Sequence, residues 1–556
     1  MNKIDYMKFK YEHLIIAIPL IITIVCSSCF ISKDYIEGFT YPKWIMFTYG
    51  TSIMLILTSI IIYRKDVPAT TSDLLIGVIL STLITILIPK SSYYNDVTNL
   101  CLLICFCTIC RLISLHTDIL KVTAMSFILG AGISTAYALL QLFKDGEITG
   151  CYDNIVGLDI TLILGIFSII FLLKNNKFNL KGKILFILII LIFLILILIS
   201  KSRLAVLTSI VVSFIFFPKI KKLIIIPILA SMFIYSYCIT GKYESSCGRA
   251  FILKTSISLL NSPEKILNGY GENGFSANYM LRQSELLKNE SEISKQRAAN
   301  IAHPLNEFVL STIKYGIVFT VIVLTSLGII LFSKDTPKFG KAIILTIMLF
   351  SFFSYPMKYP ISWIALGVGI SSYALDKKNI RKIRLNMAGA SILIVIATLL
   401  TAFHLNSMLL QREWKSTYTQ AMLGKKQQAL TNYLNLSKRL KSNEFRYNHA
   451  SYLHNLGLNF QAKAIMSNID YIDYETEMLI GRINVGLEKY NDALKNFILA
   501  SEMCPNRFLP LFEIYKIYET TNNKEKMEMY RELIKNKNVK IPSPQIDYIK
   551  KYVSSR

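Results

Sequence analysis

The segment Ile184–Ser200 reads ILFILIILIFLILILIS and contains no charged residue. A second stretch of the same kind, Leu223–Ile239, follows it. Segments of this length and composition need a lipid environment or a large dry interior. The 556-residue chain around them is 53% hydrophobic and 17% charged, with a mean hydropathy of +0.44, and is more apolar than an average soluble protein. The composition predicts an integral membrane protein with a soluble part attached, and it excludes disordered, collagen-like and disulfide-scaffold chains.

Apolar runs long enough to span a hydrocarbon layer recur through the first three quarters of the chain. We expect an all-α transmembrane bundle over residues 1–405, with about thirteen spans (roughly 12–14). The run at 204–217 is short, and the two runs beside Tyr355–Pro360 could instead form one broken helix. The expected spans are 12–32, 44–63, 73–89, 99–115, 122–143, 155–173, 184–200, 204–217, 223–240, 306–332, 342–356, 360–375 and 387–405.

The basic residues alternate between successive loops. Lys and Arg number 61 against 36 acidic residues, and they concentrate in every second loop, as at 174–183, 219–222 and 377–384. Because cytoplasmic loops collect Lys and Arg, this alternation predicts a cytoplasmic N-terminus, with the large loop 241–305 and the tail 406–556 on the outer side. No basic segment with interleaved aromatic readers stands out, so nucleic acid is not an expected partner.

The tail from 411 to 540 has the pattern of a helical repeat. Small residues recur at about the 34-residue period of a tetratricopeptide repeat. In the clearest unit, Glu475–Asn506, Gly481 and Ala493 fall at close helix contacts and Phe497 at an aromatic position. Stacked helix pairs form a concave surface that binds protein segments, and a rigid spacer is the alternative. Other units are marked by Ala429, Ala462 and Met527, and His449 and His454 are expected on the repeat surface.

The ten cysteines do not form a framework. Cys107 and Cys110 have CxxC spacing but lie in an apolar run without further ligands in reach, so we expect no metal site. Cys151 and Cys247 fall in outward loops and could pair in an oxidising compartment, which the sequence leaves open.

Ionisable residues are almost absent from the spans and gather at the outer boundary, which disfavours a transport path. His303 stands in the segment Ala302–Phe308, where a span opens after the large outer loop. Pro304 suits the first turn of a helix, so we expect His303 near an N-cap, where the helix dipole favours anions and a neutral imidazole. Such a group can act as a general base, with Asn306 and Glu307 orienting the ring or an acceptor; a capping histidine is the alternative.

Two arginines occupy comparable positions. Arg203, beside Lys201, begins a span at its outer end, and Arg249 opens the large loop. A guanidinium can hold phosphate oxygens in bidentate fashion, whereas snorkelling at the interface is the alternative. Together with His303 they suggest a pyrophosphate-linked lipid substrate, with the glycine-rich stretch Gly269–Phe275 between them.

At these residues the chain resembles the O-antigen ligase and polymerase superfamily, which includes bacterial protein O-oligosaccharyltransferases. Two departures are visible: Leu305 stands where many members have a second histidine, and Leu204 replaces a glycine. The resemblance rests on Gln141 followed by Thr149–Asn154, on Ser200–Ala205, on Arg249 followed by Gly269–Phe275, and on His303–Phe308 followed by Tyr315–Gly316.

The resemblance implies transfer of a glycan from undecaprenyl pyrophosphate to an acceptor hydroxyl at the periplasmic face of the bacterial inner membrane, without a metal or cofactor. Carried onto this sequence, Arg203 and Arg249 would hold the pyrophosphate and His303 would activate the acceptor, with Asn154 and Lys201 in support. The acceptor could be a protein, the lipid A core or a growing glycan, as in a polymerase. Competing interpretations are an exporter of the same lipid and a scaffold that recruits protein partners through its repeats.

Overall fold

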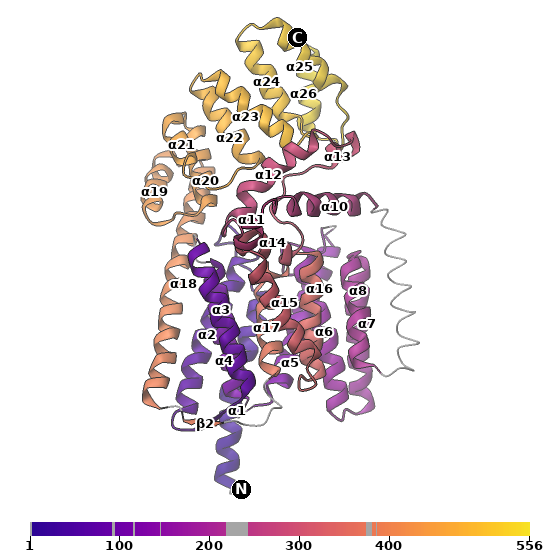
Figure 1. The fold of residues 1–556 in the computed structure, drawn as a ribbon, viewed down its shortest axis with the longest axis vertical. Helices are drawn as coiled ribbons and strands as arrows, with labels where there is room; N and C mark the ends of the chain where they lie inside the picture. The colour runs from indigo at the N-terminus through magenta and orange to yellow at the C-terminus, as the bar shows by residue number, and fades with distance from the viewer. Residues whose placement is uncertain are drawn as a thin grey trace. The chain divides into compact units, whose positions relative to one another are not determined.

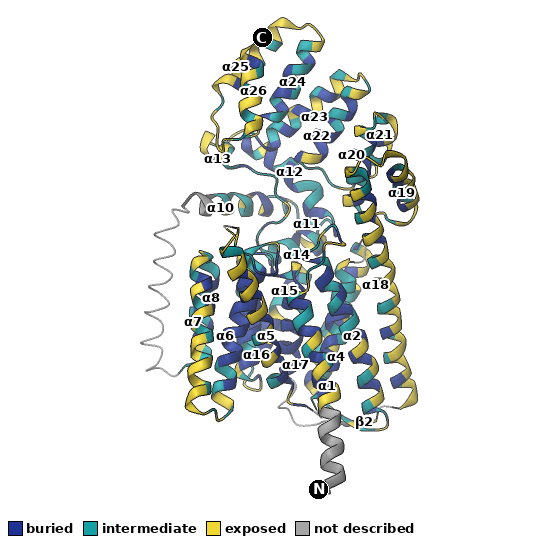
Figure 2. Ribbon diagram, turned by 180° about the vertical axis from the view of Figure 1, so that it is seen from behind, coloured by how far each residue is buried: buried dark blue, intermediate teal, exposed yellow. Residues whose placement is uncertain are grey.

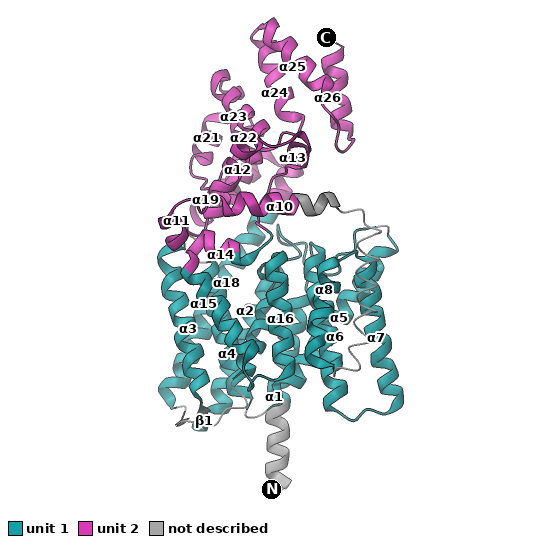
Figure 3. Cartoon of the chain, turned by 45° about the vertical axis from the view of Figure 1, so that its right-hand side comes forward, with its two compact units in different colours: residues 1–242, 305–308, 318–415 teal, residues 243–304, 309–317, 416–556 magenta. Residues whose placement is uncertain are grey.

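The structure is a computed structural model that describes residues 3–91, 95–114, 117–144, 146–217, 243–373, 381–384 and 386–555. Most of these residues are helical, and the strands among them form a two-stranded sheet (Figure 1). The chain divides into two compact units, which Figure 3 colours separately. The first contains residues 1–242, 305–308 and 318–415, and the second contains residues 243–304, 309–317 and 416–556.

The first unit is a bundle of apolar helices. Among the described residues, seven helices are long and apolar enough to cross a membrane, namely α2 to α7 and α18. The elements are α1 (Lys3–Cys29), α2 (Tyr41–Ile62), β1 (Asp66–Ala69), α3 (Thr71–Leu87), η1 (Ile88–Lys90), α4 (Asn95–Ile113), α5 (Ile119–Leu142), α6 (Ile155–Asn175), α7 (Leu180–Ile199), α8 (Arg203–Phe216), α15 (Ile317–Phe332), α16 (Lys338–Phe353), η2 (Pro356–Lys358), α17 (Pro360–Ser372), β2 (Arg381–Arg384) and α18 (Met387–Met422).

Burial differs sharply between two neighbouring helices of this bundle. α6 is buried along most of its length. By contrast, α7, which includes most of Ile184–Ser200, exposes isoleucine and leucine side chains over most of its surface (Figure 2). A helix that is apolar all round but exposed would be unstable in water, because nothing offsets the cost of hydrating its side chains. The exposed surface of α7 is therefore suited to contact with lipid, and α7 is long and apolar enough to cross a membrane.

Most of the expected spans coincide with described helices, and the span at 223–240 lies outside the described residues. The span expected at 306–332 is wrong as one helix: it divides at Gly316 into α14 (Glu307–Tyr315) and α15. Gly316 has φ of 90°, which breaks helical geometry and favours glycine. The runs around Tyr355–Pro360 are two helices, α16 and α17, separated by η2.

Contacts within the first unit join loops that the charge pattern assigns to the same side. β1 pairs with β2 in antiparallel register, joining two loops from the basic set. In the other set, Asp153 forms an ion pair with Lys358, and Asp34 forms one with Arg412 (3.2 Å). Each of these contacts joins segments that the charge pattern assigns to the same set.

The second unit is entirely helical among its described residues, and its C-terminal part is built from four helical hairpins. In each hairpin one residue of the connecting turn has positive φ: Gly424 (75°), Gly457 (78°), Glu488 (59°) and Asn522 (54°). The elements are α10 (Tyr243–Ile257), α11 (Pro263–Asn268), α12 (Gly274–Leu287), α13 (Glu292–Arg297), α14, α19 (Lys426–Arg439), α20 (Asn443–Asn455), α21 (Asn459–Met466), α22 (Tyr474–Gly486), α23 (Tyr490–Met503), α24 (Leu509–Thr520), α25 (Lys524–Asn536) and α26 (Pro544–Ser554).

Small residues mark these hairpins as the sequence predicts. Ala429, Ala462 and Ala493 are fully buried in the second helix of successive hairpins. A Cβ atom added at Gly481 would lie 2.5 Å from Cε1 of Phe497, so the glycine lets α22 approach the aromatic ring of α23 closely.

The segment 243–304 packs against these hairpins. Its residues Phe275 and Tyr279 share one hydrophobic core with Met478, Phe497 and other residues of the hairpins. The sequence analysis placed 241–305 as a loop within the transmembrane domain, whereas the structure packs 243–304 with the C-terminal tail in one unit.

Candidate functional site

The N-terminus of α8 positions the first predicted arginine. The helix begins at Arg203, as expected, and the hydroxyl of Ser202 caps it by accepting a hydrogen bond from the backbone N–H of Ala205 (3.3 Å). The same hydroxyl donates to the carboxylate of Asp159, which lies in α6 and is 1% exposed. Lys201 precedes the cap with φ of 56°. These contacts fix Arg203, half-buried, at the positive end of a helix, where anions are favoured.

The loop before α6 is held by a single glutamine side chain. Oε1 of Gln141 accepts hydrogen bonds from the backbone N–H groups of Thr149 (3.0 Å) and Gly150 (2.8 Å), and its Nε2 donates to the Gly150 carbonyl (3.2 Å). Asn154 ends the loop and caps α6, because its Oδ1 accepts from the N–H of Val156 (3.1 Å). The glutamine is thus in direct contact with the loop that follows it in the motif, while Asn154 caps a helix.

A polar cluster that the sequence analysis missed lies next to this loop. Asp153 pairs with Lys358 and accepts a hydrogen bond from the hydroxyl of Tyr359 (3.0 Å). The ring of Tyr152 packs edge-on against Tyr359, with centroids 5.2 Å apart. Lys43 is fully buried, donates to three backbone carbonyls and lies 4.9 Å from the Tyr152 ring centroid. The sequence gives a weak signal for this cluster, because Lys43 directly precedes an apolar run and resembles an ordinary loop lysine.

The helix after His303 begins later than expected. α14 starts at Glu307, so Pro304 is not in its first turn and His303 is not beside its N-cap. Leu305 between them has φ of 57°, a left-handed conformation that ends any regular geometry there. The residue in the capping position is Asn306, whose Oδ1 accepts a hydrogen bond from the N–H of Phe308 (3.0 Å).

Asn306 and Glu307 have further partners within the first unit. Nδ2 of Asn306 donates to the carbonyl of Phe352 (2.9 Å), at the end of α16. Oε1 of Glu307 accepts from the backbone N–H of Met357 (3.1 Å), in η2. These contacts anchor the start of α14 to the connection between α16 and α17, which is a different role from the expected orientation of the His303 ring.

In the second unit, the glycine-rich stretch binds the end of α14. The backbone N–H of Tyr270 donates to the Ile313 carbonyl (2.7 Å), and that of Gly271 donates to the Lys314 carbonyl (2.9 Å). Gly269 and Gly271 both have positive φ (68° and 87°). A Cβ at Gly269 would lie 2.6 Å from the Lys314 carbonyl oxygen, so this close approach requires glycine.

His303 follows a segment that the hairpins hold in place. Nδ2 of Asn506 donates to the carbonyls of Gln296 (2.9 Å) and Ala298 (2.8 Å). Nε2 of Gln283 donates to the Ala299 carbonyl (3.0 Å), and Nδ2 of Asn300 donates to the carboxylate of Asp473 (3.0 Å). The segment 296–300 is therefore held by hydrogen bonds from α12 and from the hairpins. It ends three residues before His303, which is half-buried.

The predicted site residues divide between the two units. Arg203, Lys201, Asn154, Asn306 and Glu307 belong to the first unit. Arg249 and His303 belong to the second, where Arg249 is an exposed residue of α10.

The cysteines and the other acidic and histidine residues add no metal centre to this arrangement. Within the described part of the chain, no group of three His, Cys, Asp or Glu side chains could hold a metal ion. Cys151 is buried, and the thiol of Cys29 in α1 donates to the Gly130 carbonyl (3.2 Å). The side chain of Cys247 lies outside the described residues.

Comparison with known proteins adds no relative. No family model matches the chain, and neither a curated protein nor a solved structure does. The functional hypothesis therefore depends on the residues themselves.

Proposed function

We propose that this chain is a multi-pass membrane glycosyltransferase of the O-antigen ligase or protein O-oligosaccharyltransferase type. It transfers a glycan from undecaprenyl pyrophosphate to an acceptor hydroxyl at the outer face of a bacterial inner membrane. Its C-terminal hairpins are tetratricopeptide-like repeats on the same side.

One observation carries the proposal: residues that the motifs bring together in sequence are joined by hydrogen bonds in the structure. Gln141 holds the loop at Thr149 and Gly150 that follows it in the motif. The glycine-rich stretch at Tyr270 and Gly271 bonds to the last turn of α14, next to the Tyr315–Gly316 pair. Contacts of this kind give a physical reason for motifs far apart in sequence to occur together.

The proposed chemistry needs little beyond these groups. As the glycosidic bond to the pyrophosphate breaks, negative charge develops on the leaving diphosphate, and the guanidinium groups of Arg203 and Arg249 stabilise it. His303 accepts the proton of the acceptor hydroxyl as that oxygen attacks the anomeric carbon.

The pairing of ionisable groups in the bundle favours this interpretation over an exporter. Arg111 of α4 makes a two-pronged ion pair with Asp73 at the start of α3, with N···O distances of 2.7 and 3.0 Å. Asp159 is bonded to Ser202 at the end of its helix. An export path would place ionisable groups near mid-membrane, whereas Asp73, Arg111 and Asp159 lie near the ends of their helices.

The acceptor we favour is a protein. The outer segment 243–304 and the hairpins share a core, so the segment that leads to His303 is part of a module of the kind that binds protein segments. The same chemistry would serve lipid A core ligation or glycan polymerisation, and glycan analysis of a deletion strain, with lipopolysaccharide and glycoprotein separated, distinguishes the three.

The decisive experiment is transfer by the purified full chain in nanodiscs. Undecaprenyl-pyrophosphate-linked oligosaccharide serves as donor, and transfer is followed by donor consumption and product mass. His303→Ala should lower the rate at least about 100-fold, which is the usual contribution of a general base. Arg249→Ala should also reduce transfer with little loss of stability, because the residue is exposed. His454→Gln, at a half-buried repeat histidine, is the matched control.

Full transfer by His303→Ala would remove the assignment of the base, and donor that stays intact with the unmodified protein would reject the function. Point variants are preferable to deletion of 411–556, because the deletion would remove most of the core that packs against Phe275 and Tyr279.

A further inference from the structure

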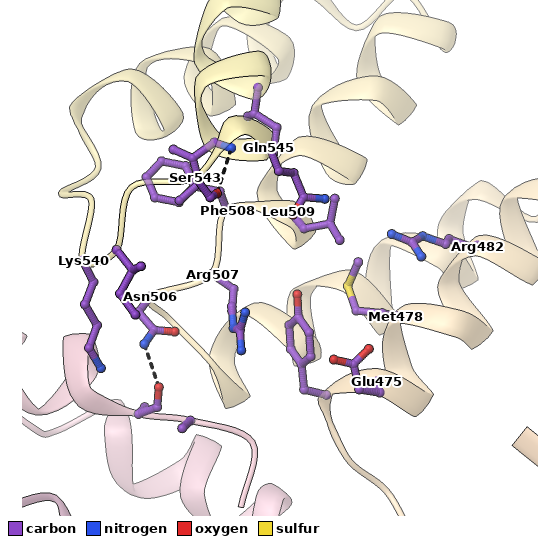
Figure 4. Close-up of a pocket in the computed structure, with 16 residues that line it drawn as sticks. Glu475, Met478, Arg482, Asn506, Arg507, Phe508, Leu509, Lys540, Ser543 and Gln545 are labelled. Carbon is purple, nitrogen blue, oxygen red and sulfur yellow. Dashed lines mark hydrogen bonds between the residues drawn. The ribbon is translucent and has the colours of Figure 1, made fainter. Parts of the chain in front are cut away.

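A groove in the second unit is not used by the proposed transfer chemistry. It encloses about 500 Å³ and is lined by α22, by the connection between α23 and α24, by residues 540–546, by α26 and by Ala298 and Ala299 (Figure 4). This volume lies within the range of ligand-binding pockets and exceeds that of one side chain.

The floor of the groove is apolar. Met478, Phe508 and Ile549 are buried there, and apolar surface makes up the larger part of the lining, with polar atoms contributing the rest. At its edge, Ile541 is 70% exposed. An apolar side chain of a partner placed against Ile541 would remove this apolar surface from water.

The rim of the groove is basic. Arg482, Arg507 and Lys540 line it with one acidic residue, Glu475. The guanidinium of the exposed Arg507 lies 5.7 Å from the ring centroid of Tyr474, which is a cation–π arrangement.

Charge pairing at the rim is incomplete. Nε of Arg482 donates to the Glu513 carboxylate (3.2 Å), so this charge is partly neutralised. In the described chain neither Arg507 nor Lys540 forms a salt bridge with a carboxylate. Carboxylates of a partner would therefore complete the rim without displacing an existing pair at these two positions.

We propose that this groove binds an acidic segment of a protein partner, in which carboxylates flank an apolar side chain. The apolar side chain occupies the floor, and the carboxylates pair with Arg507 and Lys540. A helical-hairpin array presents such a surface to extended peptide segments, and charge complementarity selects acidic ones over neutral ones.

The groove also contacts the segment that leads to His303. Ala298 and Ala299 line it, and the carbonyl of Ala298 accepts the hydrogen bond from Asn506, another lining residue. A bound segment would lie against the chain four residues before His303. If the proposed transferase function is correct, the groove presents an acceptor protein; binding itself does not require that function.

The test selects peptides on the purified full chain without donor lipid. A phage-displayed library of 12-residue peptides is selected on the unmodified protein and counter-selected on the double variant Arg507→Glu/Lys540→Glu. The expected result is enrichment of peptides with Asp or Glu around an aliphatic or aromatic residue. Peptides without an excess of acidic residues would overturn the proposal, whatever the outcome of the transfer assay.

A selected peptide is then measured by fluorescence anisotropy. We expect Arg507→Glu/Lys540→Glu to weaken binding at least tenfold and Ile541→Ser at least fivefold. The matched control Lys489→Glu/Lys524→Glu reverses two exposed charges away from the groove and should change binding less than twofold. Equal binding by the groove variants would overturn the proposal. Self-association that is lost in the double variant would identify a second copy of the chain as the occupant and would also overturn it.

Discussion

Gln283 offers the sharpest test of how the outer segment and the hairpins depend on each other. Its side chain is 1% exposed, and its Nε2 donates both to the Ala299 carbonyl (3.0 Å) and to the Met503 carbonyl at the end of α23 (2.8 Å). Gln283→Met keeps the volume of the side chain and removes both donors. The substitution therefore separates hydrogen bonding from packing.

The magnitude follows from the burial of the two acceptors. A buried carbonyl that loses its partner costs about 1–3 kcal/mol. The Met503 carbonyl is in the core and incurs this cost, whereas Ala299 lines the groove, where water can replace the lost donor. We expect a loss of about 2 kcal/mol in the stability of the second unit, which corresponds to a roughly 30-fold change in an equilibrium constant.

Hydrogen exchange measured by mass spectrometry is the appropriate assay. The three tryptophans of the chain, Trp44, Trp363 and Trp414, all lie in the first unit, so their fluorescence would report on the wrong part. Amides around residues 296–301 and 499–504 should exchange about 30-fold faster in Gln283→Met.

The control is Gln428→Met, the same change at an exposed glutamine of α19. It should alter protection by no more than about 0.5 kcal/mol. Protection of 296–301 that is unchanged in Gln283→Met would refute the view that this side chain holds the two parts together.

Three further outcomes follow from the second unit. Burial lowers the pKa of His449 to about 4; its ring stacks on that of Tyr433, with centroids 5.1 Å apart. The neutral ring therefore contributes to the free energy of unfolding above the unfolded-state pKa of about 6.5, and this contribution is lost as the pH falls toward 4. Urea unfolding should show about 2 kcal/mol lost at pH 5, and His449→Phe should remove this dependence; an unchanged pH profile would contradict it. Gly481→Ala should lower the free energy of unfolding by about 1–3 kcal/mol, because its Cβ would collide with the Phe497 ring. Gly248→Ala is the control, since its Cβ would meet nothing within 4 Å, and it should not destabilise the protein; equal melting temperatures of the two variants would contradict this prediction. Gly316→Ala should unfold the junction of α14 and α15, since its Cβ would lie 1.9 Å from a backbone carbonyl oxygen, and unchanged hydrogen exchange there would exclude the strain.

The sequence analysis also misplaced one histidine. His449 was expected on the surface of a repeat, but it is 1% exposed, whereas His454 is half-buried and bonded to Asn459 (2.7 Å). Composition and spacing predict helical hairpins, but the face of a helix that meets its neighbour depends on how the hairpins stack. Likewise, the burial of Lys43 depends on the neighbouring segments that pack around it, so the sequence could not distinguish it from a loop lysine.

Features that depend on local composition and period could be predicted from the sequence. A run rich in leucine and isoleucine, such as that in α7, needs lipid or a large dry interior, and the recurrence of small residues predicts helices that pack closely. The start of α8 at Arg203 was likewise readable, because a serine cap is a local signal.

The features that depend on distant partners could be seen only in the tertiary structure. The packing of 243–304 with the C-terminal hairpins, the hydrogen bonds to 296–300 and the late start of α14 arise from contacts between residues far apart in the chain, some separated by more than two hundred positions. Such contacts leave no periodic trace in the sequence, because a single glutamine or asparagine can supply them from many positions once the backbone has brought it close.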